Sequence, residues 1–228
     1  MPILLGIAVV VVVVIAAIWA IIGGNNTTAP VVEDTKTPAV ATSPTPTAAA
    51  PASTTQAAET PVDGGCQPIN AEGFVPTRFV IPKLGADEEV LALGVNDEGA
   101  IEAPPKNLPR TAAWWNQGPR PGSDKGKTVF SIHSYRTGKA LGNEMFTNGE
   151  SQLEPGDRLD VYGVNGEKAC YEYVEAKKIA VTDYDPDSDV MVDFEGEPLL
   201  TAITCTDFEG DSEIWKSRVF FYFKPVTE

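Results

Sequence analysis

Three side chains in the C-terminal part of the sequence could together carry out thiol-based acyl chemistry. Cys205 follows the apolar run Leu199–Thr204, and His133, the only histidine, follows the run Thr128–Ile132. Arg218 begins another such run, thirteen residues after Cys205. An imidazole exchanges protons with a thiol near neutral pH, and a guanidinium lowers a thiol pKa and can donate to an oxyanion. The predicted roles are nucleophile, proton partner and charge-stabilising group, respectively.

Each of these residues also has a purely structural interpretation. A lone cysteine is usually a small core residue, a lone strand histidine usually has satisfied hydrogen bonds, and Arg218 could pair with a carboxylate. The chain has no Cys-x-x-Cys pair, so a structural zinc site is not predicted and no cofactor is expected. Position along the chain leaves both interpretations open.

The chain has three cysteines, Cys66, Cys170 and Cys205. In an exported protein an odd count suggests one disulfide and one remaining thiol. On the odd count alone, we hypothesise that Cys66 pairs with Cys170 and that Cys205 is free.

The elements that must position these side chains are mostly short strands. From about Arg78 the sequence consists of β-branched and aromatic runs broken by Gly and Pro, which predicts an all-β sandwich or closed barrel. Short helices are predicted at Pro109–Asn116 and Ala140–Phe146. The predicted strands are Arg78–Ile81, Glu89–Val95, Ala100–Glu102, Thr128–Ser134, Arg158–Val164, Ala169–Val181, Leu199–Cys205 and Arg218–Lys224.

Two segments of different composition precede this domain. Ile3–Ile22 is uncharged and would span roughly 30 Å as a helix, so we predict a transmembrane anchor in residues 1–24 rather than a cleaved signal peptide. Residues 25–70 are rich in Thr, Pro and Ala and are predicted to be a disordered linker. Residues 71–228 form the predicted catalytic domain. The net charge of −15 disfavours nucleic-acid binding.

The motifs around these residues resemble those of the sortase family. The nucleophile motif Thr-Leu-x-Thr-Cys reads Thr201-Ala202-Ile203-Thr204-Cys205, with Ala in place of the usual Leu. His133 and Arg218 match the family's histidine and arginine. The landmark Leu-x-x-Gly-Asp reads Leu153-Glu154-Pro155-Gly156-Asp157, and the anchor and stalk match the family's layout.

The resemblance implies an eight-stranded sortase-type β-barrel with one or two short helices. It implies cleavage of a sorting signal similar to Leu-Pro-x-Thr-Gly and transfer of the thioacyl intermediate to a peptidoglycan-precursor amine. It also implies that Thr204 contacts the substrate, and that the domain lies outside a cell membrane crossed once by the N-terminal anchor. The stretch Tyr135–Gly138 is similar to that of class F or class E sortases, with class F favoured.

Two other functions fit the sequence less well. An L,D-transpeptidase would carry Ser-x-Gly-Cys-x-Arg, but Thr204 precedes Cys205 and Asp207 stands where the arginine would be. A non-catalytic, membrane-anchored β-sandwich binding module would place the three groups far apart and bury Cys205.

The acidic run Asp183–Asp189 lacks the Gly and Glu of an EF-hand, so a solvated loop is predicted there rather than a calcium site.

Overall fold

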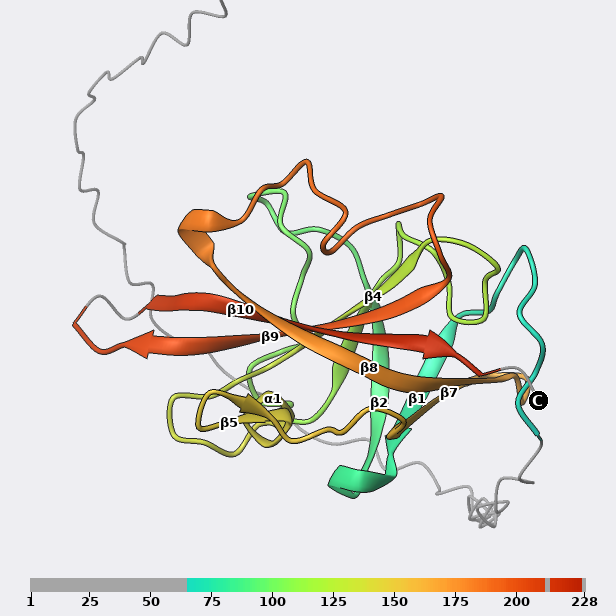
Figure 1. Cartoon of the computed structure of the whole chain (residues 1–228), viewed down its shortest axis with the longest axis horizontal. Helices are drawn as coiled ribbons and strands as arrows, with labels where there is room; N and C mark the ends of the chain where they lie inside the picture. Colours follow the sequence, from blue (N-terminus) through green and yellow to red (C-terminus); the bar gives the residue numbers. More distant parts are fainter. Residues whose placement is uncertain (1–64, 212–213, 227–228) are drawn as a thin grey trace, which may run out of the picture. The chain divides into compact units, whose positions relative to one another are not determined.

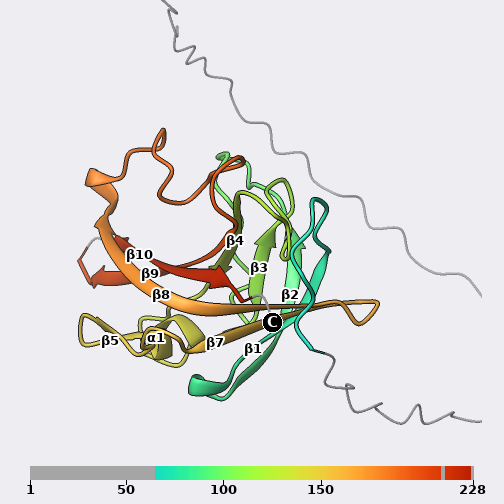
Figure 2. The same ribbon diagram turned by 45° about the vertical axis from the view of Figure 1, so that its right-hand side comes forward.

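Eight strands close into a barrel in the part of the chain that the computed structural model describes, residues 65–211 and 214–226. Their order around the barrel is β1-β2-β3-β4-β9-β10-β8-β7 (Figures 1 and 2). They are β1 (Pro76–Ile81), β2 (Ala86–Leu93), β3 (Ala112–Trp115), β4 (Lys127–Ile132), β7 (Arg158–Gly163), β8 (Lys168–Ala180), β9 (Leu199–Glu209) and β10 (Ile214–Pro225). The predicted eight-stranded sortase-type barrel is confirmed, and the sandwich alternative is wrong.

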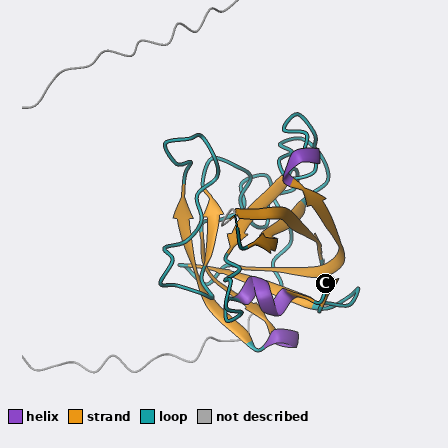
Figure 3. Ribbon diagram, turned by 90° about the vertical axis from the view of Figure 1, so that its left-hand side faces the viewer, coloured by secondary structure: helices purple, strands orange, loops and turns teal. Residues whose placement is uncertain are grey.

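The remaining elements are short. Strands β5 (Phe146–Thr147) and β6 (Glu150–Ser151) form a separate two-stranded sheet. Helix in the described residues is limited to α1 (Leu141–Met145) and two 3-10 turns, η1 (Pro82–Leu84) and η2 (Val181–Asp183) (Figure 3).

Two neighbouring strand pairs, β2–β3 and β4–β9, are parallel, and the other pairs in the barrel are antiparallel. The parallel β4–β9 pair matters most for function. In the register of this pair, the residues after β4 lie beside the second half of β9, around Cys205. The antiparallel β9–β10 hairpin places Arg218 directly opposite Cys205.

The barrel interior is filled by aromatic and aliphatic side chains at alternate strand positions. Phe79 of β1 and Phe130 of β4 are fully buried and meet edge to face, with ring centroids 6.2 Å apart. Phe221 and Phe223 of β10 are also fully buried, and both contact the ring of Tyr173 on β8. Burying side chains of this size contributes about 1.5–3 kcal/mol each, which makes the barrel a rigid support.

The structure corrects two of the predicted elements. The helix predicted at Pro109–Asn116 is wrong, because its centre, Ala112–Trp115, is strand β3, buried between β2 and β4. Trp favours strands and Ala does not, so the local preference is weak overall, and the neighbouring strands impose the extended form. The strand predicted at Ala100–Glu102 is also wrong, since only an isolated bridge between Val95 and Ile101 forms there. The helix predicted at Ala140–Phe146 is confirmed as α1.

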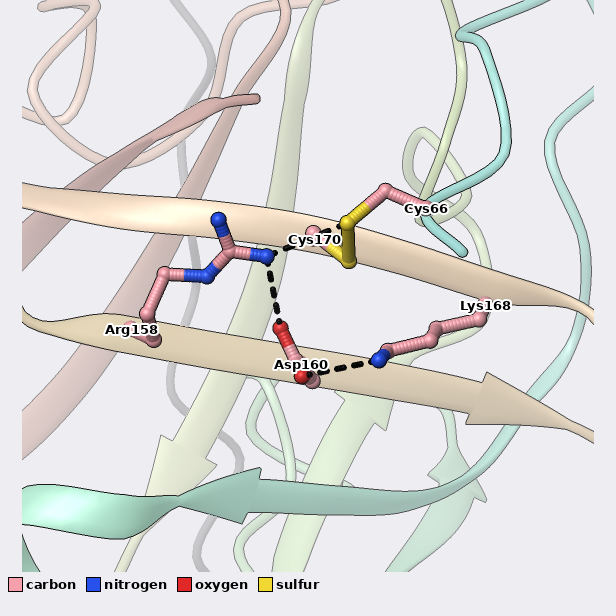
Figure 4. Close-up of a disulfide and its surroundings, with 5 residues drawn as sticks. All are labelled: Cys66, Arg158, Asp160, Lys168 and Cys170. Atoms are coloured by element: carbon pink, nitrogen blue, oxygen red, sulfur yellow. Dashed lines mark hydrogen bonds and ion pairs between the residues drawn. A yellow bond between two sulfur atoms is a disulfide. The ribbon is translucent and has the colours of Figure 1, made fainter. Parts of the chain in front are cut away.

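A disulfide fastens the start of the described chain to the barrel. Cys66 is bonded to Cys170 of β8, 104 residues away, with a Cα–Cα distance of 5.4 Å, and Cys205 is the free cysteine. Figure 4 shows Arg158 between this disulfide and Asp160, whose carboxylate also pairs with Lys168 at 3.3 Å. The hypothesised cysteine pairing is confirmed.

None of the helices in residues 65–211 and 214–226 combines the length and the apolar character needed to cross a bilayer. The predicted anchor in residues 1–24 lies outside the described residues, and so does the predicted linker up to residue 64.

Candidate active site

Cys205, His133 and Arg218 occupy neighbouring positions on three adjacent strands. Cys205 of β9 is the direct register partner of Arg218 on β10. On the other side of β9, the parallel register with β4 ends at Ser131 opposite Ile203. Two residues further along both chains, His133 comes beside Cys205. Since alternate residues share one face, the three side chains form a row on the outer face of the barrel with the thiol in the middle.

The three side chains line a single cavity of about 620 Å³. Most of the residues that line it come from the outer face of β4, β9 and β10, from the segment 95–103 and from the segment between Val181 and Val192. Its lining is mainly apolar and consists of Val95, Gly99, Ala100, Ile101, Ala103, Trp115, Ser131, Ile132, His133, Val181, Tyr184, Met191, Val192, Ile203, Thr204, Cys205, Arg218 and Phe220.

The free thiol of Cys205 is half-buried in this cavity. Burial raises its pKa above the ordinary value of a cysteine, and the nearby Arg218 guanidinium lowers it by a smaller amount. The expected effect of Arg218 on the thiol is therefore present but is outweighed by desolvation. In the unliganded protein the thiol form predominates at neutral pH.

His133 is fixed both through its main chain and through its ring. Its carbonyl oxygen accepts a hydrogen bond from the N–H of Gly142 at the start of α1, at 2.9 Å. Its Nε2 atom lies 2.5 Å from the carbonyl oxygen of Pro104. A Cβ at position 142 would come within 2.6 Å of the His133 carbonyl and 2.9 Å of the Thr204 methyl. Only glycine allows α1 to lie this close to the end of β4.

Arg218 is oriented by its own hairpin. Its Nη1 atom donates to the carbonyl oxygens of Trp215 and Ser217, each at 3.1 Å. Among the described residues no acceptor is hydrogen-bonded to Nε or Nη2. These N–H groups can therefore donate to an oxyanion formed next to Cys205, and their fixed direction avoids a reorganisation cost during the reaction.

Thr204 lies beside the cysteine, but its side chain faces the opposite way. The residue is 1% exposed, and its methyl group lies against Gly142. Its hydroxyl oxygen has no hydrogen-bond partner among the described residues. A contact between Thr204 and a substrate would therefore be made by its main chain, and the geometry does not support a role for its hydroxyl.

The wall formed by the loop before β9 is held by side chains that the sequence did not single out. The ring of Tyr184 stacks on that of Phe220 at 6.0 Å, and the Tyr222 hydroxyl donates to the carbonyl of Val190 at 2.7 Å. The buried Lys127 ammonium donates to the carbonyl of Asp189. The Tyr222 and Lys127 contacts are made to main-chain carbonyls, which every residue has, so the sequence does not reveal them. The one available signal is a lysine at the start of a buried strand.

The carboxylates of this loop serve local turns. Asp193 accepts hydrogen bonds from the N–H groups of Glu195 and Gly196, and Asp185 accepts one from Asp187. In the described part of the chain no three His, Cys, Asp or Glu side chains are grouped so as to hold a metal ion.

Comparisons with known proteins identify the family of this domain. A family model described as the sortase domain matches residues 79–226. A solved lid mutant of sortase C1 from Streptococcus agalactiae is 23% identical with a TM-score of 0.45, and 67% of this chain and 68% of that one are covered. Sortase C-1 from Actinomyces oris is 20% identical with a TM-score of 0.45, and the coverage is 68% and 76%.

The search of curated proteins found no match. The family model covers well over half of the chain, and the barrel, the free cysteine and the shared cavity fit the same family. This chain belongs to the sortase family of cysteine transpeptidases, which act on sorting-signal peptides and amine nucleophiles.

Proposed function

We propose that Cys205 is the nucleophile of this sortase, His133 its proton partner and Arg218 the group that stabilises the oxyanion. The observation that supports these roles is the row of the three side chains across β4, β9 and β10 at the floor of one cavity. A reacting carbonyl placed above Cys205 would have a proton donor on one side and a guanidinium on the other.

In the first half of the reaction, His133 removes the proton from the Cys205 thiol and the sulfur attacks the scissile carbonyl carbon. The oxygen of the tetrahedral intermediate accepts hydrogen bonds from the free N–H groups of Arg218. His133 then returns the proton to the departing amine, and a thioester remains on Cys205. Because the thiol pKa is raised in the unliganded cavity, we propose that thiolate formation coincides with substrate binding rather than preceding it.

In the second half, the incoming amine attacks the thioester and gives its proton to His133. The sulfur of Cys205 leaves as a thiolate and takes this proton back from His133, and the new amide is released. The apolar walls of the cavity favour this aminolysis over hydrolysis by limiting the access of water.

The proposed donor substrate is a peptide similar to Leu-Pro-x-Thr-Gly, cleaved between Thr and Gly, and the proposed acceptor is a peptidoglycan-precursor amine. The apolar lining supports a donor with aliphatic side chains. We further propose that Thr204 contacts this peptide through its main chain.

Residues 1–24 would anchor the enzyme in the cell membrane, with the catalytic domain outside. The Tyr135–Gly138 stretch supports class F or class E, with class F favoured.

The experiment that tests these roles measures cleavage of a fluorogenic sorting-signal peptide. We expect Cys205→Ala, His133→Ala and Arg218→Ala each to lower kcat/KM by at least ~10³-fold, because the three groups act as one unit. Arg218→Lys keeps the charge but loses the planar fork, and it should recover little of the activity.

The matched control is Arg120→Ala, which removes an exposed guanidinium that does not line this cavity. Its kcat/KM and the thermal melting temperatures of all variants should stay close to those of the unmodified protein. Full activity in Cys205→Ala would rule out the proposed nucleophile.

A further inference from the structure

An extended segment that precedes β3 is attached to the end of β4 by three consecutive side-chain contacts. Ser131 donates its hydroxyl to the carbonyl of Glu102 at 2.6 Å. His133 Nε2 lies 2.5 Å from the carbonyl oxygen of Pro104, and the Tyr135 hydroxyl donates to the carbonyl of Lys106. We call residues 102–106 the histidine strap.

The spacing of the contacts matches on both sides. Ser131, His133 and Tyr135 are alternate residues, and so are the three residues of the histidine strap whose carbonyls they reach. The equal spacing on the two sides lets each of the three side chains reach one carbonyl of the strap. In the described part of the chain no main-chain hydrogen bond joins the strap to β4. The three side chains therefore make the polar connection.

Two prolines within the strap explain why it does not become another barrel strand. Pro104 and Pro105 have no N–H to donate to a neighbouring strand, and the strap ends in a turn in which the Leu108 N–H donates to the Pro105 carbonyl. Pro104 is buried, so its carbonyl is held against the imidazole rather than exposed to water. The main chain of His133 is held separately by Gly142. With the main chain and the strap both fixed, the imidazole faces the strap through its Nε2 atom.

The chemistry of this contact decides where the imidazole carries its hydrogen. A carbonyl oxygen can only accept a hydrogen bond, so the Nε2 atom of His133 must be the donor. In the neutral ring Nδ1 then has no hydrogen and keeps its lone pair. We infer that the histidine strap holds neutral His133 as the Nε2–H tautomer and leaves Nδ1 as the atom that takes and returns the proton. Ser131 and Tyr135 are positioning residues that hold the strap.

The part of this inference that concerns proton transfer rests on the proposed function, but the tautomer can be measured without any reaction. Because the chain has one histidine, a ¹⁵N-histidine-labelled full-length protein in detergent gives one set of ring nitrogen signals. At a basic pH at which the ring signals no longer change with pH, we expect a protonated Nε2 and an unprotonated Nδ1. A ring protonated on Nδ1 would overturn the inference.

Variants of the two positioning residues supply the second measurement. In Ser131→Ala and Tyr135→Phe, we expect the two nitrogen signals to move toward each other as the tautomers mix. We also expect kcat for peptide cleavage to fall by about tenfold with little change in KM. Ser131→Thr retains a hydroxyl and should restore both the signals and kcat. Ring signals identical to those of the unmodified protein in both variants would overturn the positioning role.

The matched control is Thr77→Val on β1, which removes a hydroxyl-to-carbonyl bond to Tyr162 far from the cavity. It should change neither the ring signals nor kcat. Circular dichroism and thermal melting verify that every variant is folded. If the peptide is not cleaved at all, the proposed function fails, while the tautomer measurement still tests the strap.

Discussion

At the residue scale, the state of the Cys205 thiol is the result of two opposing effects. Desolvation in the apolar cavity raises its pKa, and the Arg218 guanidinium lowers it by less. A buried thiol is protected from adventitious oxidation and alkylation, because the thiolate is the reactive form. In the proposed mechanism, the same burial means that Cys205 depends on His133 to remove its proton when the substrate arrives.

This balance predicts how Cys205 reacts with iodoacetamide as a function of pH. We expect the alkylation rate of the unmodified protein to rise with a midpoint above the ~8.5 of an ordinary cysteine. Arg218→Gln removes the effect that lowers the pKa, so its midpoint should lie higher still. Arg120→Gln is the matched control and should leave the midpoint unchanged. A midpoint at or below that of free cysteine would contradict the effect of burial.

At the element scale, the loop before β9 forms a wall of the cavity because the barrel holds it at two adjacent carbonyls. Lys127 of β4 and Tyr222 of β10 reach Asp189 and Val190, immediately before Met191 in the cavity lining. The Lys127 ammonium also lies over the Tyr222 ring, 5.8 Å from its centroid. The barrel thus sets the position of the loop through side chains rather than through strand pairing.

Lys127→Met tests whether this anchoring shapes the donor site. It retains most of the buried apolar stem but loses the hydrogen bond to Asp189. We expect KM for the sorting-signal peptide to rise by about tenfold, which corresponds to ~1.4 kcal/mol, with a smaller change in kcat. Lys125→Met, on the same segment but exposed and paired with Glu195, is the control and should keep the original KM. Unchanged peptide kinetics in Lys127→Met would show that the loop needs no such anchor.

At the scale of the whole domain, the Cys66–Cys170 disulfide fixes the start of the described chain to the middle of the barrel. It closes a covalent loop between residues 104 apart in sequence. Such a cross-link stabilises a protein mainly by restricting the unfolded chain. Neither cysteine lines the cavity that contains Cys205, so the bond supports the fold without taking part in the candidate site.

Replacing both cysteines, as Cys66→Ser with Cys170→Ser, should lower the free energy of unfolding by about 2–5 kcal/mol. Peptide cleavage measured well below the melting temperature should be retained. Reductant should lower the melting temperature of the unmodified protein and leave that of the double variant unchanged, which separates loss of the bond from loss of the side chains. An unmodified protein whose melting is insensitive to full reduction would contradict this stabilising role.

The sequence was sufficient for the strand-rich class and for most strands, and it singled out the three residues that the fold brings to one cavity. Strongly β-branched or aromatic runs such as Arg218–Lys224 have few alternatives to a strand, and a single histidine leaves few choices of proton partner. It failed at Ala112–Trp115, where burial between β2 and β4 overrides a weak local preference.

Only the tertiary structure decided how the reactive residues are held. The parallel β4–β9 register brings His133 beside Cys205, and that pairing depends on contacts between residues some seventy positions apart. The inward direction of Thr204, the raised thiol pKa and the contact of His133 with Pro104 depend on the same long-range packing. Residue types limit which chemistry is available, whereas burial and orientation arise only when distant segments pack together.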